Sequence, residues 1–267
     1  MEMQRRGRIH YLAPTFETKN PTSIQGFTTR HEGVSRPPYN SLNLGTNTDD
    51  TPHAVEGNRS LLARTFGITL DELLTVRQVH GSDVLVIDEP NQDIAHLTTL
   101  EADAIITNQP NLMIGVAVAD CVPILVHDTK QHVVAAIHAG WKGTALNICG
   151  KVIEGMQSIF NSTPDDLRVA IGPCIGPCCY QVDRSVATAF TDQAPIWQES
   201  AIAQDKEHWQ LDLAKANFHQ LRACGIPESH IDRAGICVSC QKELFFSHRR
   251  DDGVTGRHLG FIMLTNR

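Results

Sequence analysis

The chain has 267 residues, of which 41% are hydrophobic and 20% charged, the balance of an ordinary soluble globular protein. Its formal net charge is −7 and its basic residues are scattered singly or in pairs, which argues against a nucleic-acid-binding surface. The longest apolar run, Leu112 to Ala119, falls far short of the roughly 20 residues that a membrane-spanning helix needs.

The N-terminal segment carries positive charge, but no apolar stretch of signal-peptide length follows it. We therefore expect a cytoplasmic protein. The eight cysteines are diluted over a long chain, so we expect reduced thiols that serve as buried fillers, redox groups or metal ligands rather than a disulfide framework.

The first half of the chain predicts a long loop, one helix and a set of strands. Residues 36–50 lack apolar periodicity and are rich in turn formers, which is typical of a long ordered loop with a functional role. The segment that follows Pro52 has helical spacing and ends at Gly67. Short runs rich in Val and Ile predict strands within 74–88, 103–107 and 112–138.

The second half predicts alternating helices and strands without a strict order. Apolar spacing indicates a helix over 144–160, weakened by Gly150 and Gly155. Further helices are expected at 183–191 and 211–224, and strands at 167–172, 231–238 and 257–264. Without an internal repeat or a low-complexity tract, this mixed order favours one α+β domain over residues 1–267, layered and with mixed β-sheets.

The segment 119–144 is the most informative, because two apolar runs separated by Asp128-Thr129-Lys130-Gln131 predict a β-hairpin. With Thr129 and Lys130 at the tip, Cys121 lies opposite His138, and directly opposed Cβ atoms are about 4.5–5.5 Å apart. A thiolate and an imidazole at that distance can share a metal ion or a proton. The same register pairs His127 with His132, which we interpret as ordinary surface histidines beside the turn.

His80 is a third candidate ligand, because it ends an alternating strand and precedes Gly81, where a backbone or a ligand can approach closely. Two imidazoles and one thiolate suit Zn²⁺ or a copper ion, and three protein ligands with an open fourth position are typical of a catalytic zinc site. Spacing alone leaves it equally open that His80 is a core or surface histidine.

Other features are less specific. The turn before the 144–160 helix offers amide groups and Lys142 that can hold a phosphate, although its spacing is not that of a Walker loop. Arg59 and Arg77 are further candidate anion contacts, with a solvated surface role as the alternative. The CxxC at 237–240 predicts a zinc knuckle only weakly without a second pair, and the cysteines at 174, 178 and 179 lie in a shaped loop where they can be structural.

Several motifs together resemble one family. They are RQVHG at 77–81, ADCVPIL at 119–125, HAGWKGT at 138–144, IGPCIGPCCYQV at 171–182, FTTRHEGVSRPPYNSLNLG at 27–45 and FFSHRRDDGVTGRHLGFIML at 245–264. The chain thus resembles the laccase-domain family, also described as polyphenol oxidase, peptidoglycan editing factor or purine nucleoside phosphorylase. The resemblance spans nearly the whole chain, although Glu32 and Asp49 stand where the family pattern has glycines.

The resemblance implies that His80, Cys121 and His138 bind the metal and that the fold is the layered arrangement of the cytotoxic necrotizing factor toxins. It implies phosphorolysis of adenosine, inosine, guanosine and S-methyl-5′-thioadenosine, with adenosine deamination at the same site. We expect Zn²⁺ as the cofactor, with Cu²⁺ as an alternative, and Asp120 as the proton carrier; a hydrogen-bonding turn role for Asp120 stays open. Arg59, Arg77, Lys142, Gly143 and Thr144 are the candidate substrate contacts.

Two other activities stay open at this point. A copper oxidase of phenols is one, although the His-x-His pairs of blue-copper oxidases occur nowhere in the chain. The other is a cysteine hydrolase acting on peptidoglycan precursors, with Cys121 as nucleophile and His138 as base. The expected partners are small molecules, with no nucleic acid and no membrane, and the protein is expected to be a monomer or a homodimer.

Overall fold

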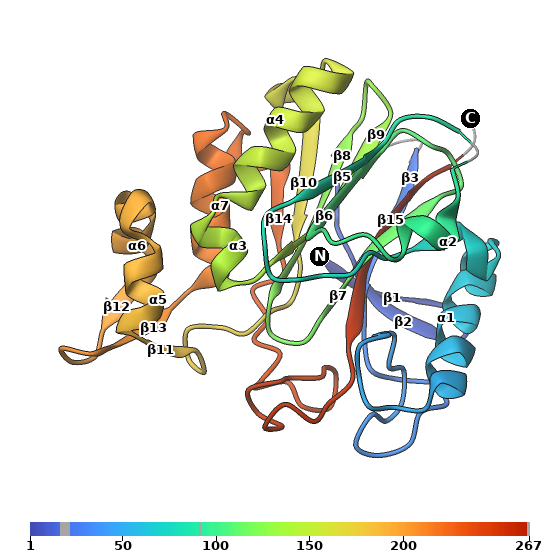
Figure 1. Cartoon of the computed structure of the whole chain (residues 1–267), viewed down its shortest axis with the longest axis horizontal. Helices are drawn as coiled ribbons and strands as arrows, with labels where there is room; N and C mark the ends of the chain where they lie inside the picture. The colour runs from blue at the N-terminus through green and yellow to red at the C-terminus, as the bar shows by residue number, and fades with distance from the viewer. Residues whose placement is uncertain (17–21, 91, 266–267) are drawn as a thin grey trace.

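The computed structural model describes residues 1–16, 22–90 and 92–265 and shows two six-stranded sheets stacked face to face, with helices on the outer faces (Figure 1). The first sheet has the strand order β1-β2-β3-β15-β7-β4. Most of its pairs are antiparallel, and β4 joins β7 in parallel. Its strands are β1 (Glu2–Arg6), β2 (Ile9–Ala13), β3 (Ser23–Thr28), β4 (Leu73–Leu74), β7 (Met113–Val118) and β15 (His258–Leu264).

The second sheet has the order β14-β10-β8-β9-β6-β5 and is also mixed, because β5 pairs with β6 and β10 with β14 in parallel. A small three-stranded antiparallel sheet, β11-β13-β12, stands at one end of the molecule. The strands of these two sheets are β5 (Val84–Ile87), β6 (Ala104–Thr107), β8 (Val122–Asp128), β9 (Val133–Ala139), β10 (Leu167–Ile171), β11 (Gln181–Asp183), β12 (Ala201–Ala203), β13 (His208–Leu211) and β14 (Ile231–Arg233).

The helices cover the outer faces of this sheet pair (Figure 1). Helix α1 packs on the first sheet, and α3, α4 and α7 lie on the side of the second. Among the described residues, no helix is both long and apolar enough to cross a membrane. The α-helices are α1 (Pro52–Phe66), α2 (Ile94–Leu97), α3 (Trp141–Ala145), α4 (Ile148–Phe160), α5 (Arg184–Ala189), α6 (Ala194–Ser200) and α7 (Leu213–Ala223), and short 3₁₀ turns lie at Leu70–Glu72, Pro164–Asp166, Thr191–Gln193 and Glu228–His230.

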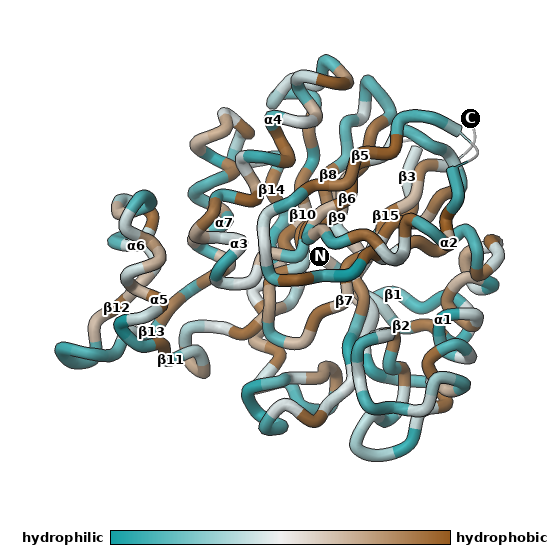
Figure 2. The backbone as a smooth tube through the Cα atoms, viewed as in Figure 1, coloured by the Kyte–Doolittle hydropathy of each residue, from teal (hydrophilic) through white to brown (hydrophobic). Residues whose placement is uncertain are grey.

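Three apolar cores hold these layers together, and strand alternation decides which side chains enter each core. On β8, Val122, Ile124 and Val126 face the helices, whereas Leu125 faces the first sheet. On β15, Phe261 faces α1 and Ile262 faces the second sheet. The hydropathy colouring shows brown strands in the middle of the molecule and teal loops at its rim (Figure 2). Parallel and antiparallel pairs within the same sheet confirm the predicted mixed β-sheets.

The helix predicted over 144–160 is two helices, because the chain breaks between α3 and α4. Asn147 has φ 57°, a left-handed conformation that interrupts the helical hydrogen-bond series. The side chain of Asn147 also lies over Gly150, where a Cβ would collide with the Asn147 side-chain amide. Gly150 therefore accommodates the break rather than weakening one long helix.

Two predicted strands are also shorter than expected. Residues 74–88 form strand only at Leu74 and over β5, because the chain turns away through the loop that carries His80. Residues 231–238 form strand only at Ile231–Arg233, since Gly235 has φ 62° and redirects the chain into the 237–240 segment. Helix α1 ends at Gly67 with φ 82°, as predicted, and residues 36–50 form the predicted irregular loop.

Candidate metal and catalytic site

His80, Cys121 and His138 converge where β8 begins and β9 ends. Their ligand atoms, the two imidazole nitrogens and the thiol sulfur, lie within 4.8 Å of one another. The His80 and His138 rings meet edge to face, with centroids 4.8 Å apart. His138 is buried, Cys121 is half-buried and His80 is exposed, so the group is reached from the His80 side. The structure thus brings together the three residues that the sequence analysis predicted as metal ligands.

The hairpin that carries two of these residues has a different register from the predicted one. Pro123, not Cys121, lies opposite His138, and Asp128 lies opposite Val133. The shift is two residues, and side chains alternate with a period of two, so Cys121 keeps the same face as His138. Cys121 therefore approaches His138 diagonally, from just before the first residue of β8.

The loop of the hairpin explains the shift. Four residues, 129–132, connect the strands instead of two, because the Asp128 carboxylate accepts hydrogen bonds from the amides of Lys130 and Gln131, both at 2.8 Å. This capped turn ends at His132, which has φ 55°. An aspartate that hydrogen-bonds the amides two and three residues ahead stabilises a longer turn than the two-residue tip that the sequence suggested.

The predicted pair of surface histidines is wrong. His127 lies opposite Val134 and is 4% exposed. It points between the sheets, where its ring nitrogens meet the hydroxyl groups of Thr22 and Ser23 at 3.2 and 3.3 Å. Burial lowers the pKa of His127 to about 4. This histidine is a structural link between the two sheets.

Asp103 organises the loop that presents His80, and sequence analysis missed it. Its carboxylate accepts hydrogen bonds from the amides of Val79, His80 and Gly81, at 3.3, 3.0 and 2.6 Å. These bonds hold His80 at φ 60°, in the left-handed region. A signal was present in the sequence, because Asp103 directly precedes the wholly buried strand β6 and is itself fully buried.

The same carboxylate orients His138. Nδ1 of His138 lies 2.7 Å from Asp103 Oδ1, and the His138 amide donates to the Asp103 carbonyl at 2.7 Å. A carboxylate in this position keeps the proton on Nδ1 and leaves Nε2 for the site, an arrangement that metal-binding histidines commonly show. Burial would lower the pKa of His138, but the Cys121 thiolate and Asp103 raise it to about 9.

Cys121 is held as a thiolate. Burial by itself raises the pKa of its thiol, but the charge and hydrogen bonds of His138 and His80 outweigh burial and lower it to about 6. A thiolate between two imidazoles can bind a soft or borderline metal ion, and it can also act as a nucleophile. The geometry alone allows both roles.

Gly140 provides room at the centre of the site. A Cβ at this position would lie 3.1 Å from Cys121 Sγ and 3.3 Å from Cδ2 of His80. Gly143 has a related role, since a Cβ there would come within 2.7 Å of the Gly81 carbonyl oxygen. The two glycines let the turn of α3 pack directly against the His80 loop.

Asp120 lies beside Cys121 with φ 91°, and its carboxylate is already engaged. One oxygen accepts from the Ser247 hydroxyl and the other from the Arg249 amide, both at 2.6 Å. The Asp120 carbonyl accepts from the Ile175 amide at 2.9 Å. These contacts give Asp120 the hydrogen-bonding loop role that the sequence left open beside that of proton carrier.

The predicted substrate contacts are dispersed. The Arg59 guanidinium is buried and donates to the carbonyls of Leu44 and Leu73, both at 3.3 Å, so it ties the long loop to the segment that leads to His80. Arg77 is exposed and pairs with Glu101 at 3.3 Å. Neither contact involves the three candidate ligands.

Within the α3 turn, Lys142 and Thr144 differ in position. Lys142 is exposed, and its ammonium lies 5.5 Å from the centre of the Trp141 ring. Thr144 is fully buried; its hydroxyl donates to the Gly140 carbonyl at 2.9 Å and accepts from Asn217 at 3.0 Å. Lys142 is therefore available to a ligand, whereas Thr144 braces the turn from within.

Arg257 is a further cation at the site that the sequence analysis did not single out. Burial lowers the pKa of Arg257, while the negative charges of Cys121 and Asp120 act in the opposite direction. The guanidinium donates to the carbonyls of Thr255 and Gly256, at 2.7 and 3.0 Å. The sequence feature that could have indicated Arg257 is its position in a Gly-rich segment directly before β15.

Comparison with known proteins identifies the family of the chain. Residues 24–265 match the family described as multi-copper polyphenol oxidoreductase laccase. The chain is 37% identical to "Purine nucleoside phosphorylase YlmD" of Geobacillus stearothermophilus over 98% of this chain and 96% of that protein, and 34% identical to the Bacillus subtilis protein of the same name over 91% and 89%. The crystal structure of YlmD from G. stearothermophilus superposes with a TM-score of 0.88 at 36% identity and covers 99% of both chains. The chain therefore belongs to the laccase-like polyphenol oxidoreductase family.

Proposed function

We propose that this protein is a zinc-dependent purine nucleoside phosphorylase that also deaminates adenosine. The observation that carries the proposal is the convergence of His80, Cys121 and His138 around the space left by Gly140. Relatives that match nearly the whole chain and are named purine nucleoside phosphorylase support the substrate class. The proposed substrates are adenosine, inosine, guanosine and S-methyl-5′-thioadenosine, each with phosphate.

The donor set fits a metal ion. Two imidazole nitrogens and one thiolate sulfur are the ligand types that Zn²⁺ prefers, and three protein ligands leave a fourth position for substrate or water. Asp103 supplies the outer hydrogen bond that fixes the His138 ring. When bound, the metal ion supplies Lewis-acid polarisation and activates water.

The protein's own residues then position the reactants. In phosphorolysis the bond between C1′ and the purine nitrogen breaks, a phosphate oxygen bonds to C1′, and the base leaves with a proton. The exposed ammonium of Lys142 and the guanidinium of Arg257 supply positive charge for phosphate. We assign proton handling to Asp120 in addition to its hydrogen-bonding loop role, because it adjoins Cys121 in the chain.

The test is product analysis with adenosine and phosphate, with and without a chelator. We expect adenine and ribose 1-phosphate from phosphorolysis and inosine from deamination, both lost on chelation and restored by Zn²⁺. His80→Ala should abolish both activities, whereas His53→Ala, at an exposed position on α1, should not. A metal-free preparation that keeps full activity contradicts the proposal, as does a zinc-loaded protein that forms no purine product.

One observation favours a second candidate, a cysteine hydrolase. Cys121, His138 and Asp103 form a linked series of thiolate, imidazole and carboxylate, in which the carboxylate orients the base for the nucleophile. In that case His80 is dispensable and chelation has no effect. Alkylation of Cys121 would abolish activity under either proposal, so the chelator and His80→Ala are the deciding measurements.

A further inference from the structure

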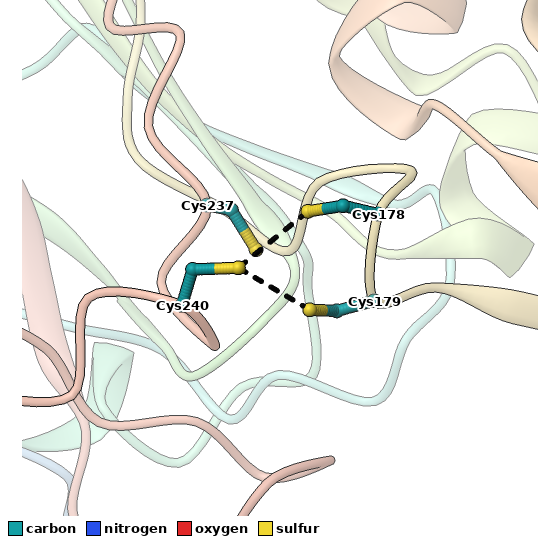
Figure 3. Close-up of side chains that lie close together, drawn as sticks. All are labelled: Cys178, Cys179, Cys237 and Cys240. Carbon is teal, nitrogen blue, oxygen red and sulfur yellow. Dashed lines mark hydrogen bonds between the residues drawn. The ribbon is translucent and has the colours of Figure 1, made fainter.

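Four other cysteines, none of them among the three residues described above, meet near the surface (Figure 3). Cys178 and Cys179 come from the loop between β10 and β11, and Cys237 and Cys240 come from the segment after β14. Their sulfur atoms all lie within 4.8 Å of one another. Cys240 Sγ lies 3.5 Å from Cys179 Sγ and 3.6 Å from Cys178 Sγ.

These separations match sulfurs that surround one ion. Zinc–thiolate bonds are about 2.3 Å long, so two sulfurs at the corners of a tetrahedron around Zn²⁺ lie about 3.8 Å apart. A disulfide would bring two sulfurs to about 2.05 Å, and all four cysteines are free in the structure. The four side chains point toward a shared centre from two sides (Figure 3).

Contacts that involve no metal hold the backbone of both loops in place. Cys174 and Cys237 form an isolated parallel β-bridge, and the Val238 amide donates to the Cys174 carbonyl at 2.9 Å. The Arg250 guanidinium donates to the carbonyls of Val238 and Ser239, at 3.0 and 3.4 Å. The cluster is therefore preorganised, and little chain entropy is lost when it binds an ion.

Two further details suit thiolate ligands. The backbone amides of Gly176 and Cys240 hydrogen-bond to Cys237, which stabilises negative charge on its sulfur. At Gly176 a Cβ would lie 3.1 Å from the Cβ of Cys237 and 3.4 Å from Cys178 Sγ, so a larger residue would push the two loops apart. The glycine lets the loops approach closely enough for their sulfurs to meet.

We propose that Cys178, Cys179, Cys237 and Cys240 bind one Zn²⁺ ion as a structural tetrathiolate site, separate from the site formed by His80, Cys121 and His138. Four protein ligands close the coordination sphere, which is typical of zinc that stabilises a fold rather than one that activates substrate. The site also gives a role to Cys178 and Cys240, which are otherwise exposed thiols open to oxidation.

The position of the cluster indicates what the zinc stabilises. The loop that carries Cys178 also supplies the Ile175 amide to the Asp120 carbonyl, and the segment after Cys240 supplies Ser247 and Arg249 to the Asp120 carboxylate. Both loops that the ion joins therefore hold Asp120, the neighbour of Cys121. In this proposal the zinc stabilises the two loops that hold Asp120 beside the candidate catalytic site.

The test uses the full chain, purified under reducing conditions. Its starting point is the variant Cys121→Ser, which removes the thiolate of the site formed by His80, Cys121 and His138. We expect this variant to retain about one zinc per chain, and zinc-edge X-ray absorption to show four sulfur ligands at about 2.3 Å. The double variant Cys237→Ser, Cys240→Ser should lose that zinc in the Cys121→Ser background. Cys224→Ser is the matched control, because Cys224 lies outside both groups, and it should leave the metal content unchanged.

A second measurement covers the case in which the double variant does not fold. Thiol titration and intact mass of the parent protein distinguish bound zinc from disulfides, each of which removes two hydrogens from the mass. Retained zinc with nitrogen or oxygen ligands, a zinc-free reduced protein, or disulfides among the four cysteines would each overturn the proposal. Hydrogen exchange in segments 174–182 and 236–250 should rise on zinc removal, and no change there would contradict the stabilising role. None of these readouts depends on purine chemistry.

Discussion

The carboxylate of Asp103 accepts a hydrogen bond from Nδ1 of His138 at 2.7 Å while it also accepts the backbone amides of Val79, His80 and Gly81. One buried group thus sets the ring orientation of one candidate ligand and the backbone of another. Asp103 holds the two imidazoles in a fixed relation, although the residues are far apart in the sequence.

Replacing Asp103 should weaken metal binding. Asp103→Asn keeps the shape of the side chain but removes the charge that favours the proton on Nδ1 of His138. We expect a 10- to 100-fold lower metal affinity, the usual effect of losing such an outer hydrogen bond. Competition with a chelator measures the metal affinity. The control is Asp83→Asn, because Asp83 is an exposed acid in the same loop. Unchanged affinity in Asp103→Asn would show that the carboxylate does not tune this site.

Gly140→Ala should block the site without unfolding the protein. Gly140 has φ −74° and ψ 174°, which alanine adopts freely, yet its Cβ would press against Cys121 Sγ and the His80 ring. We expect about a 5- to 150-fold loss of activity, because close overpacking costs about 1–3 kcal/mol. Gly57→Ala within α1 is the matched control and should be active, because a Cβ there would meet only Cγ2 of the exposed Val34, at 3.3 Å. Full activity in Gly140→Ala would mean that the space is not used.

Lys142 and Thr144 should respond differently to substitution. Lys142→Met is expected to raise the KM for phosphate about tenfold, the usual scale for losing a charged hydrogen bond, and to leave the unfolding free energy nearly unchanged. Thr144→Val removes the hydroxyl that links Gly140 and Asn217, and should lower the unfolding free energy by about 1–3 kcal/mol. Steady-state kinetics and denaturant unfolding separate the two effects; a stable Thr144→Val with a raised phosphate KM would reverse the assignment.

His127 should make stability depend on pH. Its pKa of about 4 in the folded protein lies below the value of about 6.5 of an unfolded chain, so the unfolded state binds more protons as pH falls. Stability should therefore drop by about 2 kcal/mol from this group between pH 7 and pH 5. The neighbouring charges are Asp128, His132 and Arg168.

The check is denaturant unfolding of His127→Gln at both pH values. The variant keeps a polar group near Thr22 and Ser23 but does not titrate, so its loss of stability on acidification should be smaller than that of the parent protein. His53→Gln, on the exposed side of α1, serves as control and should retain the parent slope. Equal slopes for the parent and His127→Gln would rule out this origin of the acid sensitivity.

Glu32→Gly should stabilise the loop that follows β3. Glu32 has φ 67°, a conformation that glycine adopts without cost and other residues disfavour by about 1 kcal/mol. The exposed ion pair with Arg8, at 3.6 Å, adds little. We expect a gain of about 0.5–1 kcal/mol in unfolding free energy. Glu56→Gly, inside α1, should instead cost about 1 kcal/mol; equal effects at both positions would show that the left-handed backbone is not the reason.

Local patterns were sufficient for several elements. The apolar spacing after Pro52 together with Gly67 defined α1, and the alternating runs on either side of Thr129 predicted the β8–β9 hairpin. The family motif at 27–45 also led to Glu32, the non-glycine residue in the left-handed region. These features depend on backbone preference and side-chain periodicity, which act over a few residues and can be read directly.

The register of the hairpin and the break at Asn147 required the folded structure. In the hairpin, the Asp128 carboxylate selects a four-residue loop, a choice that composition alone did not settle. At Asn147, a left-handed residue divides a stretch whose apolar spacing is continuous. In both places the conformation of one residue, Asp128 or Asn147, overrides the secondary-structure preference of the surrounding segment.

The sequence by itself determined the three candidate ligands and the family, because both lie in short motifs with distinctive residue types. Only the tertiary structure decided that Asp103 joins His80 to His138, that His127 is buried between the sheets, and that Cys178 and Cys179 meet Cys237 and Cys240. Each of these contacts joins segments distant in the sequence, and their distance is set by how the two sheets stack and where the loops leave them. Periodicity and spacing report on neighbours along the chain and carry no information on such distances.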